Sequence, residues 1–302
     1  VARGKLDTQI QNIRSMDELG RLSIGFNRML KNLKKQIELQ SQQATAQKIV
    51  ERELQMARET QRSLLPSEFP PFPDRNEFDL HAVSQAAHHV AGDFFDFFLI
   101  NPKTLIFVIA DVSGKGMSAA LVMAVTRTII RDLAKSGSSP ADILRETNER
   151  LRESQRGAAF VTVFLGSYNI SNGRIHYANG GHLPPFLINK NGVVSSEGEP
   201  TGTIVGMLEN QLYRNAEMRL LPGETLVLYT DGFTEARSPS GEFYGTTRIK
   251  NFLQANTKAS NSVLCESAIR EISLFQNENL SDDITLLALK RNATGISSFF
   301  RT

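Results

Sequence analysis

Residues 104–124 read TLIFVIADVSGKGMSAALVMA and contain a strand, a turn and a helix in direct succession. The apolar run from Leu105 to Asp111 is typical of a buried strand. The glycine-rich turn that follows ends it, and apolar residues at helical spacing predict a helix from Met117 to Ala134. Asp111 therefore falls at the tip of an apolar strand, where a carboxylate gains nothing for folding.

Strand-like runs and paired helices continue on both sides of this stretch. We expect further strands at 78–83, 94–100, 160–170, 174–178, 186–189, 217–221, 225–230 and 284–290, and further helices at 140–153, 247–254 and 261–275. Gly, Pro or Asn bounds most of these strands. Strands in hairpin succession with helices in pairs predict an α+β fold, an antiparallel β-sandwich of two sheets flanked by helix pairs.

Three more aspartates occupy the same kind of position as Asp111. Asp93, Asp231 and Asp282 each stand at the end of an apolar run. Any one of them alone is typical of a turn or a helix cap. Clustered carboxylates repel one another unless cations neutralise them, and oxygen ligands without His or Cys favour Mg²⁺ or Mn²⁺ over Zn²⁺. Four such residues in order predict a metal site.

The composition excludes several classes of protein. Of the 302 residues 40% are hydrophobic and 22% charged, and the net charge is +2, which is typical of a globular protein and not of a dedicated nucleic-acid binder. A single cysteine, Cys265, excludes a disulfide framework and a thiolate metal cluster. No run reaches the roughly 18 to 20 apolar residues of a membrane-spanning helix. Because the chain starts at Val1, we expect a fragment, the cytoplasmic part of an inner-membrane protein whose membrane segment precedes it.

The amino-terminal segment has the composition of a long helix. Residues 17–65 contain no proline and are rich in Gln, Glu, Lys, Arg, Ala and Leu. Apolar residues step by three and four at Leu19, Leu22, Phe26, Met29 and Leu33, and a seven-residue spacing resumes at Val50, Ala57 and Leu64. This spacing predicts a coiled coil and hence a homodimer formed by the N-terminal helices.

Two stretches of this segment, DELGRL at 17–22 and FNRML at 26–30, resemble the second helix of a HAMP domain, the dimeric linker that carries signals from membrane receptors to cytoplasmic effectors. The resemblance implies a partial HAMP domain at 1–36 and a coiled-coil regulatory linker at 37–66. A generic amphipathic coiled coil is the alternative interpretation. Either one predicts a dimer.

Five spaced motifs connect the rest of the chain to a known family. In order they are GDFFDFF, ADVSGKGMSAALVMA, NGGHLPP, LYTDGFTEAR and SDDITLLAL. Together they resemble the bacterial branch of the metal-dependent 2C-type serine/threonine phosphatases, which includes stress-response and stage II sporulation phosphatases. The resemblance implies a phosphatase domain at 67–291, followed by a tail at 292–302.

Carried over by position, the resemblance implies that two Mn²⁺ or Mg²⁺ ions are held by Asp93, Asp111, Asp231 and Asp282, with the backbone carbonyl of Val112 as a further ligand. Two such ions activate water for in-line attack on a phosphoryl group. Three roles are possible for Asp96 and Asp283. Each could contact a metal-bound water, ligate a third metal, or be an ordinary turn residue.

The glycine-rich turn at Ser113 to Gly116 lets backbone approach an anion at the start of the following helix. Gly114 and Lys115 are therefore candidates to bind the substrate phosphate, although a solvated lysine is an equally good interpretation. The animal enzymes of this family have a histidine general acid and a phosphate-binding arginine near the first motifs, whereas the corresponding segments here offer Ser113 and no obvious arginine. The residue that protonates the leaving group is therefore not assigned. His182, in NGGHLPP, is predicted to be structural.

The predicted architecture suggests how activity is regulated. The helix that begins at Met117 follows Asp111 directly, and the segment that contains Arg52, Ala57 and Leu64 joins the coil to the catalytic domain. We expect this segment to shift the 117–153 helix pair, so that Ala57→Pro uncouples the two parts. By resemblance, the substrate is a phosphorylated anti-anti-sigma protein with a STAS domain. The alternatives are a noncatalytic or autoinhibited dimeric scaffold and a two-metal phosphodiesterase.

Overall fold

A computed structural model describes residues 18–155 and 159–293 of the chain. It divides into two compact units, 1–56 and 57–302. Helix α1 (Glu18–Leu64) contributes 47 residues and extends through the first unit into the second. The predicted HAMP segment lies partly outside the described residues, and within them it forms only the start of this one helix. None of the helices in the described ranges is both long enough and apolar enough to span a membrane.

The second unit contains two five-stranded sheets in which every pairing between strands is antiparallel. The first has the order β1-β10-β9-β6-β7, formed by Phe78–Gln85, Ile284–Arg291, Thr225–Tyr229, Phe186–Ile188 and Val194–Ser196. The second has the order β2-β3-β4-β5-β8, formed by Phe94–Asn101, Thr104–Val112, Val161–Asn169, Arg174–Gly180 and Ala216–Arg219. The predicted α+β sandwich is confirmed.

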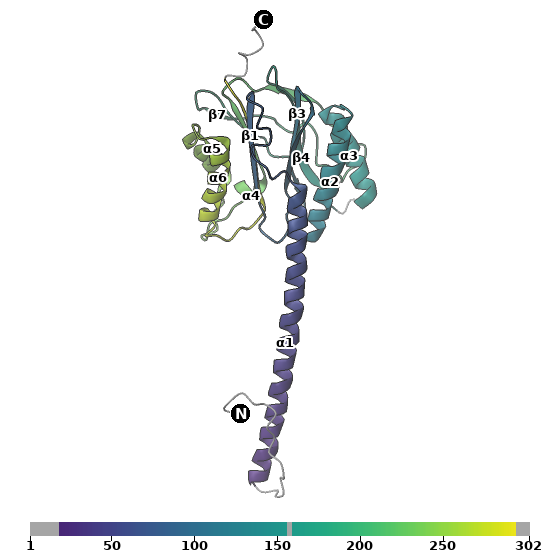
Figure 1. Cartoon of the computed structure of the whole chain (residues 1–302), viewed down its shortest axis with the longest axis vertical. Helices are drawn as coiled ribbons and strands as arrows, with labels where there is room; N and C mark the ends of the chain where they lie inside the picture. The colour runs from purple at the N-terminus through teal and green to yellow at the C-terminus, as the bar shows by residue number, and fades with distance from the viewer. Residues whose placement is uncertain (1–17, 156–158, 294–302) are drawn as a thin grey trace. The chain divides into compact units, whose positions relative to one another are not determined.

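Helix pairs cover the outer faces of both sheets (Figure 1). Helices α2 (Met117–Lys135) and α3 (Pro140–Gln155) pack on the β2–β8 sheet, and α5 (Gly245–Ala255) and α6 (Asn261–Phe275) pack on the β1–β7 sheet. A short helix, α4 (Asp231–Thr234), follows β9. Neither α4 nor β7 is predicted from the sequence, because four- and three-residue elements are too short to show a period.

The continuous apolar run of β3 is explained by burial of the strand on both of its faces. It lies between β2 and β4, and both of its faces are buried. Ile106, Val108 and Ala110 pack in the core beneath α2 and α3, whereas alternate residues such as Phe107 pack in the core between the two sheets. Because side chains alternate along a strand, burial on both sides requires apolar residues at every position.

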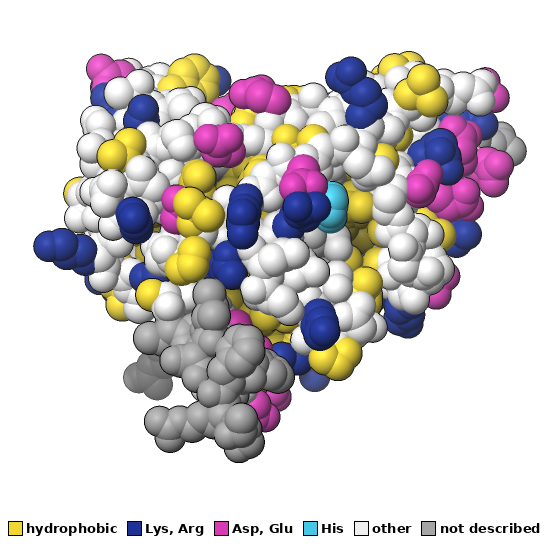
Figure 2. Space-filling model, turned by 90° about the horizontal axis from the view of Figure 1, so that it is seen from above, with side chains coloured by type: hydrophobic (Ala, Val, Ile, Leu, Met, Phe, Trp, Pro, Cys, Tyr) yellow, Lys and Arg dark blue, Asp and Glu magenta, His cyan; other side chains and the backbone are white. Residues whose placement is uncertain are grey.

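Residues of α2 at spacings of four and seven face the same core as this side of β3. Ala119, Met123, Ile130 and Ala134 are all buried there, as expected for one apolar stripe of an amphipathic helix. On the molecular face shown in Figure 2, Lys and Arg side chains are interspersed with acidic and apolar ones. That distribution agrees with a chain of nearly balanced charge.

Candidate metal centre

The turn between β3 and α2 is fixed to the start of β4 by two hydrogen bonds. The Ser113 backbone N–H donates to the Phe160 carbonyl oxygen at 2.9 Å, and the Phe160 N–H donates to Ser113 Oγ at 2.9 Å. Gly114 and Gly116 have φ values of 93° and 77°, a region that favours glycine. The turn therefore holds Asp111 and the Val112 carbonyl in one place at the end of β3.

Asp93 lies beside Asp111 because of the register between β2 and β3. Phe94 pairs with Ala110, so the residue preceding β2 stands next to the residue that follows Ala110. Asp93 is 2% exposed, and its Oδ2 accepts a hydrogen bond of 2.6 Å from Thr230 Oγ1. The structure thus brings together the first two predicted ligands in a buried place.

Burial and the charges of neighbouring carboxylates raise the pKa of both carboxyl groups. Burial, with the charge of Asp111 added, raises the pKa of Asp93 well above its usual value. Burial raises the pKa of Asp111 to about 7, and the charge of Asp231 contributes, whereas a hydrogen bond with Asp93 opposes the rise. Both shifts show that two negative charges here are unfavourable without a cation.

Asp231 and Asp282 come from the other sheet. Asp231 directly follows Thr230 at the end of β9, and Asp282 precedes β10. The two strand ends are joined where the Thr230 N–H donates to the Thr285 carbonyl oxygen at 3.1 Å. Burial, followed by the charges of Glu235 and Asp282, raises the pKa of Asp231. The second pair of predicted ligands is therefore also adjacent.

The carboxylate of Asp283 accepts hydrogen bonds from two backbone N–H groups. Its Oδ1 accepts a hydrogen bond from the Ala87 N–H at 2.9 Å, and its Oδ2 accepts one from the Gly92 N–H at 2.7 Å. These bonds anchor the loop that ends at Asp93. Burial raises the pKa of Asp283 although these backbone hydrogen bonds lower it. A side chain at Gly232 would meet the Asp283 carbonyl oxygen, so glycine is needed beside Asp231.

Asp96 is held by two arginines of α2. Its Oδ2 lies 3.1 Å from Arg127 Nε and 3.7 Å from Arg131 Nε, and the Asp side chain is 1% exposed. Burial raises the pKa of Asp96 more than the two guanidinium groups lower it. Asp96 therefore ties β2 to α2.

His182 connects β4, the strand that pairs with β3, to the end of β9. Its Nδ1 lies 2.8 Å from Thr162 Oγ1 and its Nε2 lies 3.1 Å from the Tyr229 carbonyl oxygen. Thr162 pairs with Asp111 across β3 and β4, and Tyr229 is close to Asp231 in sequence. Burial lowers the pKa of His182 to about 4, so the ring is neutral at pH 7 and supports the site as a structural residue.

The donor chemistry of the site fits Mg²⁺ or Mn²⁺. All four strand-end aspartates supply hard oxygen ligands, and the raised pKa values of three of them follow in part from neighbouring carboxylates. Within residues 18–155 and 159–293, however, no three His, Cys, Asp or Glu side chains lie close enough together to enclose an ion. Binding a metal therefore requires the carboxylates to turn toward one another.

The predicted regulatory residues lie along α1 and at the start of α2. Arg52 is exposed and Ala57 is half-buried on α1, and Met117 is the 43% exposed first residue of α2. Leu64 lines a groove of about 610 Å³ together with Arg127 and other residues. The end of α1 and the middle of α2 thus share a surface.

Gln61 is a contact residue that sequence reasoning missed. Its Nε2 donates to the Ala91 carbonyl oxygen at 2.7 Å, and its Oε1 accepts from the Ala91 N–H at 2.9 Å. Ala91 lies two residues before Asp93. The last turns of α1 therefore hold the loop that carries a predicted ligand. Because the helix is rich in glutamine, nothing in the sequence distinguishes this one.

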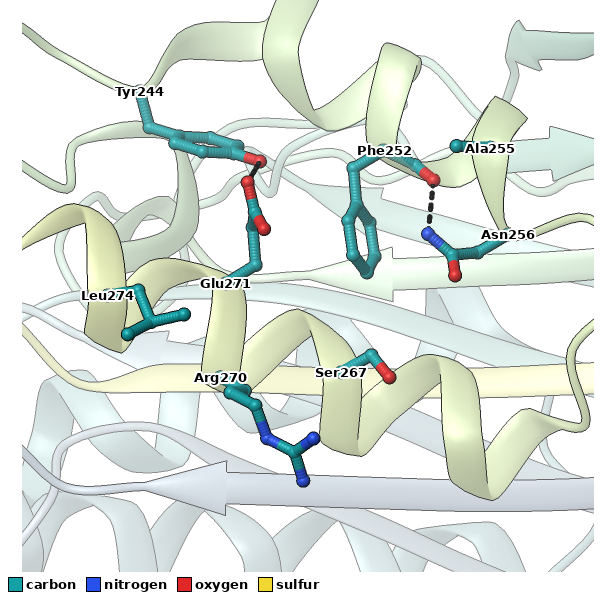
Figure 3. Close-up of a pocket in the computed structure, with 8 residues that line it drawn as sticks. All are labelled: Tyr244, Phe252, Ala255, Asn256, Ser267, Arg270, Glu271 and Leu274. Carbon is teal, nitrogen blue, oxygen red and sulfur yellow. Dashed lines mark hydrogen bonds between the residues drawn. The ribbon is translucent and has the colours of Figure 1, made fainter.

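A separate cavity lies between α5 and α6 (Figure 3). It has a volume of about 470 Å³ and is lined by Tyr244, Phe252, Ala255, Asn256, Ser267, Arg270, Glu271 and Leu274. Tyr244 donates a hydrogen bond of 3.1 Å to Glu271 at its edge. None of the strand-end aspartates lines this cavity, so it does not identify the reaction site.

The fold has clear counterparts among solved structures. The PP2C domain of SiaA from Pseudomonas aeruginosa matches with a TM-score of 0.72 and 24% identity, covering 82% of this chain and 99% of that one. The RsbU and RsbW domains of a Mycobacterium tuberculosis protein match with a TM-score of 0.61 and 26% identity, covering 72% of this chain and 60% of that one. The PP2C architecture of two antiparallel sheets between helices is thereby shown.

Sequence relatives point to the same family. Protein IcfG of Synechocystis is 34% identical over 97% of this chain, and the match spans only 49% of IcfG. Phosphoserine phosphatase RsbU of Bacillus subtilis is 26% identical over 81% of this chain and 72% of its own length. The family described as Stage II sporulation protein E (SpoIIE) matches residues 101–292. The chain belongs to the SpoIIE family of PP2C-type phosphatase domains.

Proposed function

We propose that this chain is a metal-dependent protein serine/threonine phosphatase whose metal ligands are Asp93, Asp111, Asp231 and Asp282, with the Val112 carbonyl as a fifth. The observation that carries the proposal is the adjacency of the buried Asp93 and the half-buried Asp111, two carboxyl groups whose pKa values are raised partly by neighbouring carboxylates. Two relatives with the printed name phosphoserine phosphatase support the reaction type.

Bound at such a site, divalent ions would supply an activated water for attack on phosphorus and would neutralise the phosphoryl oxygens. The protein's own residues hold the proposed ligands in position. Asp111 and Val112 are held by the turn that Ser113 fixes, and Asp93 is held by Thr230. The nearby His182 is a structural residue with a low pKa, so it does not serve as the general acid at neutral pH.

Thr230→Val provides a test of this positioning. The hydroxyl of Thr230 donates to Asp93 Oδ2 and accepts a hydrogen bond of 3.0 Å from the Thr285 N–H. Losing a group that orients a metal ligand typically costs about 10- to 100-fold in metal affinity. We expect that loss for Mn²⁺ in calorimetric titrations, with Thr128→Val on the exposed side of α2 as the matched control. Equal Mn²⁺ affinity in Thr230→Val and the unmodified protein would contradict the assignment of Asp93 as a ligand.

The substrate that we propose is a phosphoserine or phosphothreonine on an anti-anti-sigma protein with a STAS domain. The resemblance to stress-response phosphatases supports this class, as does the similarity to an RsbU domain that occurs in one chain with an RsbW domain. The direct test is release of phosphate from such a phosphoprotein with Mn²⁺ and with a chelator. Cleavage of a bis-ester alone would indicate a phosphodiesterase, and no cleavage with any divalent metal would indicate a scaffold.

We also propose that α1 forms a homodimer and transmits a signal to the metal site. Leu19, Leu22 and Met29 are 72%, 70% and 54% exposed on this helix, although their spacing is that of a coiled-coil seam. A second copy of the helix would cover them. A HAMP-type role for residues 18–36 implies attachment to the inner membrane through a region that precedes this chain, with the catalytic domain in the cytoplasm.

Gln61→Ala tests the link between α1 and the site. The substitution removes both hydrogen bonds to Ala91, and the loop before Asp93 then loses a constraint. We expect the Mn²⁺ concentration for half-maximal phosphate release to rise about 10-fold, the lower end of the range for groups that orient ligands. Gln47→Ala, in the exposed part of α1, is the control. Unchanged Mn²⁺ dependence in Gln61→Ala would show that this contact does not influence the site.

A further inference from the structure

Lys115 lies in the glycine-rich turn after β3 and reaches across to the segment before β10. Its Nζ donates a hydrogen bond of 2.9 Å to the Ser281 carbonyl oxygen and lies 3.1 Å from Asp282 Oδ2. Asp282 is one of the four proposed metal ligands. In this arrangement the ammonium group neutralises a carboxylate that a divalent ion would also need.

The charge of Lys115 extends beyond Asp282. Burial, Glu235 and Asp282 raise the pKa of Asp231, and the positive charge of Lys115 opposes this rise. Arg127 and Arg131 of α2 are paired with Asp96. Lys115 therefore acts as the counter-charge for the pair of aspartates from β9 and β10.

The side chain of Lys115 is free to leave this position. It is 51% exposed, and Asp282 is 39% exposed, so the ion pair contributes little to folding. Side chains built at Gly114 or Gly116 would meet nothing within 4 Å, which shows open space on both sides of the lysine. A lysine ammonium on a flexible stem can move between partners, unlike an arginine held by a bidentate pair.

The same open turn precedes α2, a helix of 19 residues with no side-chain hydrogen bond at its N-cap residue, Gly116. The first N–H groups of a helix favour an anion. An ammonium group released from Asp282 would therefore remain next to a place where a phosphoryl group is favoured.

We propose that Lys115 is a movable counter-charge that competes with a divalent ion for Asp282 and, once displaced, binds the phosphoryl oxygens of the substrate. This inference rests on the proposed phosphatase function and extends it, because the same side chain opposes metal binding and favours phosphate binding. Its removal must therefore change the two affinities in opposite directions. A merely structural lysine would weaken both, and a solvated lysine would change neither.

The test compares Lys115→Met with the unmodified chain and with Lys103→Met. Lys103 is an exposed lysine in the β2–β3 turn, at the opposite end of β3 from Asp111. Calorimetry measures the binding of Mn²⁺ to each protein, and then the binding of inorganic phosphate to each Mn²⁺-loaded protein. For Lys115→Met we expect Mn²⁺ to bind about 3- to 10-fold more tightly and phosphate about 10-fold more weakly, as for the loss of one partly exposed charge. Lys103→Met should leave both values unchanged.

Each result has a definite meaning. Mn²⁺ affinity in Lys115→Met equal to or below that of the unmodified chain would overturn the competition, and unchanged phosphate affinity would overturn the role in phosphate binding. Lys115→Arg, which keeps the charge, should restore most of the phosphate affinity. If the unmodified chain bound no Mn²⁺, the proposed function and this inference would both fail. If it bound Mn²⁺ and both affinities were equal in Lys115→Met, only this inference would fail.

Discussion

Asp111→Asn is expected to lower the Mn²⁺-dependent release of phosphate from a phosphoserine protein by about 10³-fold or more, because ligand charge at a two-metal site contributes several kcal/mol to the transition state. Asparagine preserves the shape of the side chain and removes the charge. Asp111 lies at the end of β3 next to Asp93, where burial and other carboxylates raise its pKa to about 7. The measurement is the initial rate of phosphate release at saturating Mn²⁺.

Stability distinguishes a lost ligand from a damaged fold. At pH values above 7, the loss of one of two repelling charges should raise the Tm of the metal-free protein, even as activity disappears. Asp132→Asn, an exposed aspartate on α2, should change neither property. Activity above one tenth of the unmodified rate in Asp111→Asn would exclude Asp111 as a metal ligand. A lowered Tm would attribute the loss to misfolding.

Mn²⁺ binding should weaken steeply as pH falls below about 7. Metal ligands must be deprotonated, so binding releases protons wherever the free site holds them. The pKa of Asp111 is raised to about 7, and the pKa of Asp93 is raised well above its usual value. We expect Kd for Mn²⁺ to rise about 10-fold for each pH unit below 7 from the titration of one such group, as measured by calorimetry.

The same shifts set the pH dependence of folding without metal. A carboxyl group whose pKa is raised in the folded state contributes stability that is fully present below its unfolded pKa of 3.8 and is lost as the pH rises toward 7. The Tm increase produced by Mn²⁺ should therefore be larger at pH 8 than at pH 6. In Asp111→Asn the pH dependence of Mn²⁺ binding should become flatter. An Mn²⁺ affinity independent of pH between 5 and 8 would show that these carboxyl groups do not bind the ion.

Local sequence patterns were sufficient to predict most of the fold. Strand β3 needed apolar residues on both faces, and this produced a run that is visible without any structure. The spacing of buried residues in α2 likewise follows the helical period. The strand-end position of Asp111 follows from the same pattern, because the apolar run stops there. These features depend on residues that are close in sequence, and so the sequence alone contains them.

Features that join distant residues were not accessible in this way. The sequence left three possible roles for Asp283. Its hydrogen bonds to the N–H groups of Ala87 and Gly92 join residues almost 200 positions apart. The pairing of Asp96 with Arg127 depends on how α2 packs over β2, which no local period fixes. The contact between Gln61 and Ala91 depends on where α1 ends on the catalytic unit. Tertiary packing decides each of these, and sequence periodicity does not encode it.

The division of the four aspartates between two sheets has a mechanical consequence. Asp93 precedes β2 and Asp111 lies in β3 of one sheet, whereas Asp231 follows β9 and Asp282 precedes β10 of the other sheet. A slide of one sheet over the other by a single residue is about 3.3 Å, which exceeds the length of any metal–oxygen bond. Ions that bind aspartates from both sheets would therefore prevent one sheet from sliding over the other. Their retention would report the alignment of the two layers, and proteolysis or hydrogen exchange at the layer contact would slow when they bind.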